Sequence, residues 1–127
     1  MISGLERRGG NLPRIAVVDD SPFILEMWQS RVEDAVVEAF SSPEEFLRRV
    51  AQEGEFLSHL ACVVTDFHFG DSSAMTGAMF ALELKRLGGP KVLLSSDTPK
   101  SSLDDEQMFD GRIGECPANW LALSKVV

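Results

Sequence analysis

The sequence predicts a doubly wound α/β domain, in which helices cover both faces of a parallel sheet. Strand patterns alternate with helical patterns along the chain, which is typical of β-α units. The apolar runs are continuous rather than alternating with polar residues, as in strands that are buried on both faces. With 127 residues, of which 44% are hydrophobic and 25% charged, the chain is expected to form one domain.

The first two strand-helix units begin with clear local signals. "RIAVV" at 14–18 predicts the first strand, and Pro22 then starts a helix because proline is well tolerated at the first helical position. A second strand is expected at 35–40. Ser42 and Glu45 form a capping-box pattern that starts the next helix. The first helix carries an apolar stripe at helical spacing, made of Ile24, Met27, Trp28 and Val32.

The later elements become progressively weaker toward the C-terminus. A helix from about Thr76 is stopped by the Gly-Gly-Pro sequence at 88–90. The polar helix near the end and the last short strand have few apolar residues to fix them. The expected elements are a strand at 61–66, the helix from Thr76, a strand at 91–95, a weak helix at 99–109, a strand at 111–115 and a last helix at 117–125.

Composition and charge exclude several function classes. Residues 1–13 lack an apolar run and are expected to be a flexible leader rather than a signal peptide, so the domain should span 14–127. No stretch approaches the roughly 20 apolar residues of a membrane span. The net charge of −8 argues against binding to nucleic acid. Cys62 and Cys116 have no metal-ligand spacing, which favours a reducing, cytoplasmic setting.

Polar side chains follow three of the predicted strands. Asp19 and Asp20 come directly after the first strand, Asp66 ends the third, and Ser95 and Ser96 end the fourth. Ligand sites of doubly wound sheets lie at the carboxyl ends of the strands. Carboxylates suit Mg²⁺, which is usually held together with phosphate oxygens, and one carboxylate can act as a nucleophile toward a phosphoryl group. The pattern predicts a Mg²⁺-dependent phosphoryl site.

Taken together, these motifs resemble the receiver domains of two-component response regulators over about residues 14–124. The resemblance is carried by "VVDDSP", "VVTDF", "TGAMFALELKRLG" and "GPKVLLSSD", in the order and spacing of the family. It implies a flavodoxin-like (βα)5 fold with strand order 2-1-3-4-5. It also implies a signalling domain rather than an enzyme.

The resemblance assigns roles to individual residues. Asp66 corresponds to the phosphoacceptor, which would bind Mg²⁺ together with Asp19, Asp20 and the backbone carbonyl of His68. Ser95 corresponds to the hydroxyl residue that binds the phosphoryl group and couples it to the switch, although Ser96 could compete for this role. The implied partners are a histidine kinase or phosphotransfer protein and a downstream protein, with a homodimer as a further possibility.

Three departures from the family pattern lie near the expected site. Cys116, before Pro117, stands where the family has lysine, and Ile113 stands where the family has an aromatic switch residue. The loop after Asp66 is about three residues longer than usual. Close carboxylates raise one another's pKa, so a pocket without the lysine should depend more strongly on a metal or keep one carboxyl protonated. These departures leave open a pseudo-receiver, which would bind partners independently of phosphorylation.

Other basic residues and other protein families fit the sequence pattern less well. Lys91, Arg112 and Lys125 are the basic residues that could replace the lysine, but the predicted strand directions do not favour them. The aspartate-nucleophile phosphatases use two acids separated by one residue, whereas Asp19 and Asp20 are adjacent. A dinucleotide-binding domain would need a Gly-x-Gly-x-x-Gly motif after the first strand, and none is present.

Overall fold

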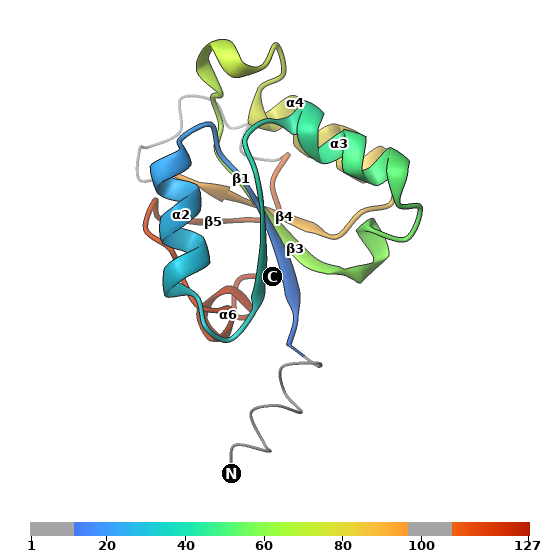
Figure 1. The fold of residues 1–127 in the computed structure, drawn as a ribbon. Helices are drawn as coiled ribbons and strands as arrows, with labels where there is room; N and C mark the ends of the chain where they lie inside the picture. The colour runs from blue at the N-terminus through green and yellow to red at the C-terminus, as the bar shows by residue number, and fades with distance from the viewer. Residues whose placement is uncertain (1–11, 97–107) are drawn as a thin grey trace.

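In the computed structural model, which describes residues 12–96 and 108–127, five parallel strands form one sheet in the order β2-β1-β3-β4-β5 (Figure 1). This confirms the predicted fold class and strand order. Helices alternate with the first four strands along the chain. The strands are β1 (Arg14–Val18), β2 (Val36–Phe40), β3 (Leu60–Thr65), β4 (Lys91–Ser95) and β5 (Gly111–Ile113).

Helices cover both faces of the sheet. Figure 1 shows α2 and α6 on one side of the strands and α3 and α4 on the other. The predicted helix starts are confirmed for the first two helices, where Ser21 and Ser42 accept hydrogen bonds as N-caps. The helices are α2 (Pro22–Arg31), α3 (Pro43–Gln52), α4 (Gly77–Arg86) and α6 (Trp120–Leu123), with short 3₁₀ helices at Leu57–His59 and Gly70–Ser72.

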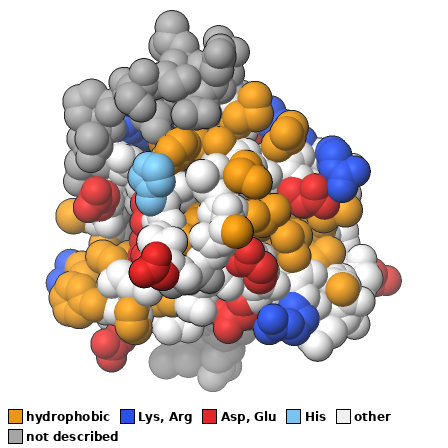
Figure 2. Space-filling view, turned by 90° about the horizontal axis from the view of Figure 1, so that it is seen from above, with side chains coloured by type: hydrophobic (Ala, Val, Ile, Leu, Met, Phe, Trp, Pro, Cys, Tyr) orange, Lys and Arg blue, Asp and Glu red, His pale blue; other side chains and the backbone are white. Residues whose placement is uncertain are grey.

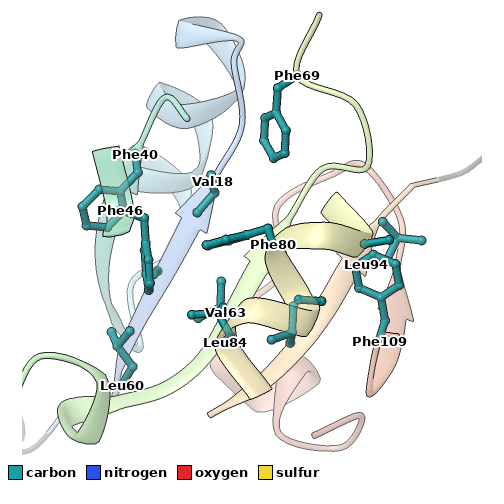
Figure 3. Packing of buried hydrophobic residues seen from close by; sticks show 14 of the residues in the cluster. Val18, Phe40, Phe46, Leu60, Val63, Phe69, Phe80, Leu84, Leu94 and Phe109 are labelled. Atoms are coloured by element: carbon teal, nitrogen blue, oxygen red, sulfur yellow. The ribbon is translucent and has the colours of Figure 1, made fainter. Parts of the chain in front are cut away.

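Two apolar clusters separated by the sheet form the core. Successive residues of one strand point to opposite faces, so Ile15 and Val17 of β1 pack with Trp28 of α2, while Ala16 and Val18 belong to the other cluster. The second cluster is rich in phenylalanine, and Figure 3 shows its rings between the sheet and the helices. The ring pairs there include Phe40–Phe46, with centroids 5.1 Å apart, and Phe46–Phe80, at 5.2 Å.

The C-terminal part of the chain differs from the prediction in its boundaries. The fifth strand ends at Ile113 rather than at residue 115, and the last helix begins at Trp120 rather than at residue 117. The side chain of Asp34 accepts hydrogen bonds from the backbone N–H groups of Trp120 (2.7 Å) and Leu121 (3.0 Å). This contact across the fold, rather than Pro117, satisfies the first N–H groups of the helix.

Two predictions fall largely outside the described residues. They are the leader at 1–13, of which only residues 12 and 13 are described, and the helix at 99–109, of which only residues 108 and 109 are described. Within the described parts of the chain, no helix has both the length and the apolar character needed to cross a membrane.

Candidate functional site

The three aspartates meet at the carboxyl ends of β1 and β3. Asp19 and Asp20 follow β1, and Asp66 follows β3. The backbone N–H of Asp66 donates to the carbonyl of Val18 (3.1 Å), which continues the pairing of the two strands beyond their ends. One carboxylate oxygen from each aspartate lies within 4.8 Å of the other two. Parallel pairing thus places side chains far apart in sequence around one point.

A pocket of about 200 Å³ opens between these carboxylates. Figure 2 looks down on this end of the molecule, where several acidic side chains lie on the visible face among hydrophobic ones. Among the described residues, those lining the pocket carry four carboxylates and no Lys or Arg. The lining residues are Asp19, Asp20, Ser21, Ile24, Asp66, Ser95 and Glu115.

Hydrogen bonds to neighbouring residues in the sequence fix the orientation of two of the carboxylates. Oδ1 of Asp19 accepts from the backbone N–H of Ser21 (2.9 Å), just before α2. Oδ1 of Asp66 accepts from the backbone N–H of Phe67 (2.8 Å). Each aspartate therefore holds one oxygen in a local turn, while its carboxylate remains beside those of its neighbours.

Burial and crowding disfavour the charged forms of these carboxyls. Burial raises the pKa of Asp19 from 3.8 to about 6, against the opposing effect of the Ser21 N–H, and the charges of Asp66 and Asp20 raise it further. Burial likewise raises the pKa of Asp66, against the opposing effect of the Phe67 N–H, and the charge of Asp20 raises it further. A divalent cation would relieve this repulsion, and carboxylate oxygens are the donors that Mg²⁺ prefers. The donor set therefore fits the implied metal.

Folding stability without metal should rise as the pH falls through the pKa of Asp19. This carboxyl has a higher pKa in the folded state, about 6 against 3.8, so the folded protein binds its proton more tightly than the unfolded chain. We expect a higher melting temperature at pH 5.5 than at pH 7.5 in EDTA. Asp19→Asn should reduce this difference, because asparagine keeps the acceptor for Ser21 without the charge. If circular dichroism shows the same pH dependence of the melting temperature in the unchanged protein and in Asp19→Asn, this prediction is contradicted.

Ser95 lies in the pocket and Ser96 does not. The side chain of Ser95 is buried, lines the pocket, and donates from Oγ to the carbonyl of Gly114 (3.2 Å). Ser96 is half-buried, and its backbone N–H donates to the carbonyl of Ile113 (3.0 Å). Of the two candidate hydroxyls, the structure brings that of Ser95 to the carboxylates.

His68 and Ile113 lie near the site without lining the pocket. The exposed ring of His68 packs edge-on against Phe67, with centroids 4.6 Å apart, and metal binding by its backbone carbonyl stays a prediction. Ile113 is half-buried at the end of β5 and packs against the apolar cluster that contains Trp28.

The segment after β5 differs from the arrangement that the sequence suggested. Cys116 is exposed and is not among the residues that line the pocket, whereas Glu115 is. The family resemblance indicated Cys116 because it precedes Pro117, but a sequence motif gives no information about the direction of a side chain in an irregular segment. The only signal for Glu115 was its position next to Cys116.

The basic candidates for replacing the lysine lie elsewhere. Lys91 begins β4, at the opposite end of the strand from Ser95. Arg112 donates from Nε to the carbonyl of Ser96 (3.1 Å), and Lys125 is exposed beyond α6. None of them lines the acidic pocket as described.

The longer loop after β3 packs beside the carboxylates. It forms the 3₁₀ helix Gly70–Ser72, which starts at a residue with a φ of 56°. A Cβ atom at Gly70 would lie 3.3 Å from Oδ2 of Asp20, so the loop backbone approaches this carboxylate closely. Ser73 ties the loop to α3 by donating from Oγ to Oε2 of Glu44 (2.8 Å).

Comparison with known proteins identifies the fold. No protein family and no curated protein matches the chain by sequence. Among solved structures, the chemotaxis protein CheY4 of Vibrio cholerae aligns with a TM-score of 0.68 and 19% identity, over 91% of this chain and 99% of that one. A response regulator receiver domain protein from Clostridium thermocellum gives a TM-score of 0.67 and 21% identity, over 91% and 90%.

A third similar structure also matches nearly the whole of both chains. The signal receiver domain of an HD domain-containing protein from Pseudomonas fluorescens aligns with a TM-score of 0.67 and 14% identity, over 91% of this chain and 90% of that one. The likeness extends over nearly the whole of each chain, whereas few residues are identical. It therefore establishes the fold, and the function has to be argued from the site.

Proposed function

We propose that this chain, which has the fold of response regulator receiver domains, is itself a receiver domain over residues 14–127 and accepts a phosphoryl group on Asp66. The observation that carries the proposal is the meeting of Asp19, Asp20 and Asp66, with one oxygen from each within 4.8 Å of the others. The buried hydroxyl of Ser95 lines the same pocket. These groups supply a nucleophile, a cation site and a hydrogen-bond donor.

The phosphoryl donor would be a phosphohistidine on a histidine kinase or a phosphotransfer protein. A carboxylate oxygen of Asp66 attacks the phosphorus atom, so an O–P bond forms while the N–P bond breaks. The leaving imidazole nitrogen keeps the electron pair and takes up a proton. The Oγ hydroxyl of Ser95 then turns from the carbonyl of Gly114 to a phosphoryl oxygen.

Asp19, Asp20, Asp66 and the backbone carbonyl of His68 would hold Mg²⁺. When bound, the ion supplies positive charge that offsets the carboxylates and the phosphoryl oxygens. The residues of the chain orient the acceptor: the N–H of Phe67 donates to Oδ1 of Asp66, and the half-buried position of Asp66 strengthens the local electrostatic interactions relative to water.

The output of such a domain is binding to a protein rather than turnover of a substrate. Phosphorylation would withdraw the Ser95 hydroxyl from Gly114 and so loosen the segment that follows β5. A downstream protein or a second copy of the chain would read this change. The proposal places the chain in the cytoplasm, where histidine kinases carry their phosphorylated domains.

A pseudo-receiver is the second candidate, and one observation favours it. Glu115 lines the pocket on the segment where receiver domains normally present a lysine, and a carboxylate there cannot bind a phosphoryl oxygen as an ammonium group does. In this reading the fold and the acids persist, and partner binding does not depend on phosphate. Ile113, without an aromatic ring, is consistent with it.

Exposure of the purified chain to acetyl phosphate and Mg²⁺ separates the two candidates. We expect intact-mass spectra to show one added phosphoryl group, which disappears when EDTA replaces Mg²⁺. Beryllium fluoride with Mg²⁺ should shift amide resonances around Asp66 and Ser95. If neither reagent produces a Mg²⁺-dependent change, the phosphoacceptor function is rejected and the pseudo-receiver remains.

A further inference from the structure

We propose that Glu115 is a specificity-determining residue of the acidic pocket, which favours a bound cation over a bound phosphoryl group. The inference rests on the proposed function, because it concerns the same pocket. It goes beyond that function in assigning an opposing role to a residue outside the receiver motifs. Glu115 would keep the unmodified, metal-bound form in excess over the phosphorylated form.

The position of Glu115 is set by the backbone that precedes it. The carbonyl of Ile113 accepts from the backbone N–H of Ser96 (3.0 Å), and the carbonyl of Gly114 accepts from Oγ of Ser95 (3.2 Å). Two consecutive carbonyls are thus hydrogen-bonded to residues at the end of β4, and Glu115 is the next residue in the chain. Glu115 is exposed and lines the pocket together with Asp19 and Asp66.

The charge of Glu115 affects two of the three aspartates. After burial, which is the largest cause, the negative charge of Glu115 contributes to the raised pKa of both Asp19 and Asp66. Glu115 therefore interacts electrostatically with aspartates that follow two different strands. The lining of the pocket, as far as the chain is described, offers no Lys or Arg to offset it.

The same charge has opposite effects on the two ligands. A divalent cation between the aspartates gains attraction from a fourth carboxylate. A phosphoryl group on Asp66 replaces one negative charge by about two near neutral pH, in a pocket that Glu115 also lines. Like charges repel, and because Glu115 is exposed, water and salt reduce this repulsion without removing it. Glu115 should thus strengthen Mg²⁺ binding and weaken phosphoryl retention.

Calorimetric titration with Mg²⁺ alone tests the first effect without any phosphoryl donor. We expect Glu115→Gln to weaken Mg²⁺ binding on the order of 3- to 10-fold at low ionic strength, the size expected for one partly screened charge. Glu115→Lys should weaken it further. Glu33→Gln is the matched control, because this exposed residue follows the far end of α2 and its replacement removes the same charge. Equal Mg²⁺ affinity in Glu115→Gln and the unchanged protein would overturn the inference.

The lifetime of the phosphorylated form tests the second effect. After acetyl phosphate is removed, Glu115→Gln and Glu115→Lys should retain the phosphoryl group longer than the unchanged protein and Glu33→Gln. Unchanged lifetimes would overturn the inference and leave the proposed function intact. Conversely, the titrations could show the expected loss of Mg²⁺ affinity in Glu115→Gln while the unchanged protein gains no phosphoryl mass. This result would reject the proposed function but not the effect of Glu115 on the cation.

Discussion

Replacement of Asp66 by asparagine is expected to abolish the uptake of a phosphoryl group from acetyl phosphate with Mg²⁺. The amide of asparagine has no anionic oxygen to attack phosphorus. It has nearly the same shape, however, and its oxygen can still accept the hydrogen bond from the N–H of Phe67, which measures 2.8 Å to Asp66. The fold should therefore survive while the chemistry is lost. Intact-mass spectra after equal exposure give the measurement.

Asp71→Asn is the matched control for this variant. Asp71 lies five positions further along the same loop, is exposed, and does not line the acidic pocket. It should gain the phosphoryl mass to the same extent as the unchanged protein. Uptake by Asp66→Asn at the level of the unchanged protein would show that the acceptor is a different side chain.

The Asp66→Asn variant also has a predicted effect on stability. Burial raises the pKa of Asp66, so its charge opposes folding above that pKa, and removal of the charge should raise the melting temperature at pH 7.5 in EDTA. A variant that is more stable and yet inactive excludes unfolding as the reason for lost activity.

Gly77→Ala is expected to destabilise the domain by about 1–3 kcal/mol, the usual cost of forcing extra atoms into a packed site. A Cβ atom at Gly77 would collide with the backbone carbonyl oxygen of Asp66 and lie 2.9 Å from Cα of Phe67. These are backbone atoms, which cannot move aside by changing a rotamer. The N–H of Gly77 also donates to the carbonyl of Phe67 (2.6 Å). This hydrogen bond joins the first residue of α4 to the residue that follows Asp66.

Urea unfolding measures the cost, and Gly54→Ala provides the comparison. A Cβ atom at Gly54 meets no atom within 4 Å, so alanine there should leave the stability nearly unchanged. Because Gly77 contacts the residue proposed to accept the phosphoryl group, its alanine variant should also be phosphorylated more slowly. Equal stability of the two alanine variants would mean that the α4 start can shift away from Asp66 at little cost.

The sequence by itself determined the α/β class and the position of the three aspartates. Continuous apolar runs such as "RIAVV" identify buried parallel strands, and the residue after a strand is fixed by the chain itself. Since parallel strands end at one edge of the sheet, Asp19, Asp20 and Asp66 had to meet there. The caps at Ser21 and Ser42 are equally local, because the hydroxyl and the N–H that it accepts from are only three residues apart.

Only the tertiary structure decided the rest of the pocket. Glu115 rather than Cys116 lines it, and α6 starts at Trp120 because Asp34, 86 residues earlier, accepts the N–H groups of the helix. The hydroxyl of Ser95 reaches Gly114 across 19 residues. Each of these outcomes depends on contacts between distant segments in irregular backbone. In irregular backbone no periodicity constrains the direction of a side chain. The direction is determined instead by the segments that pack against it.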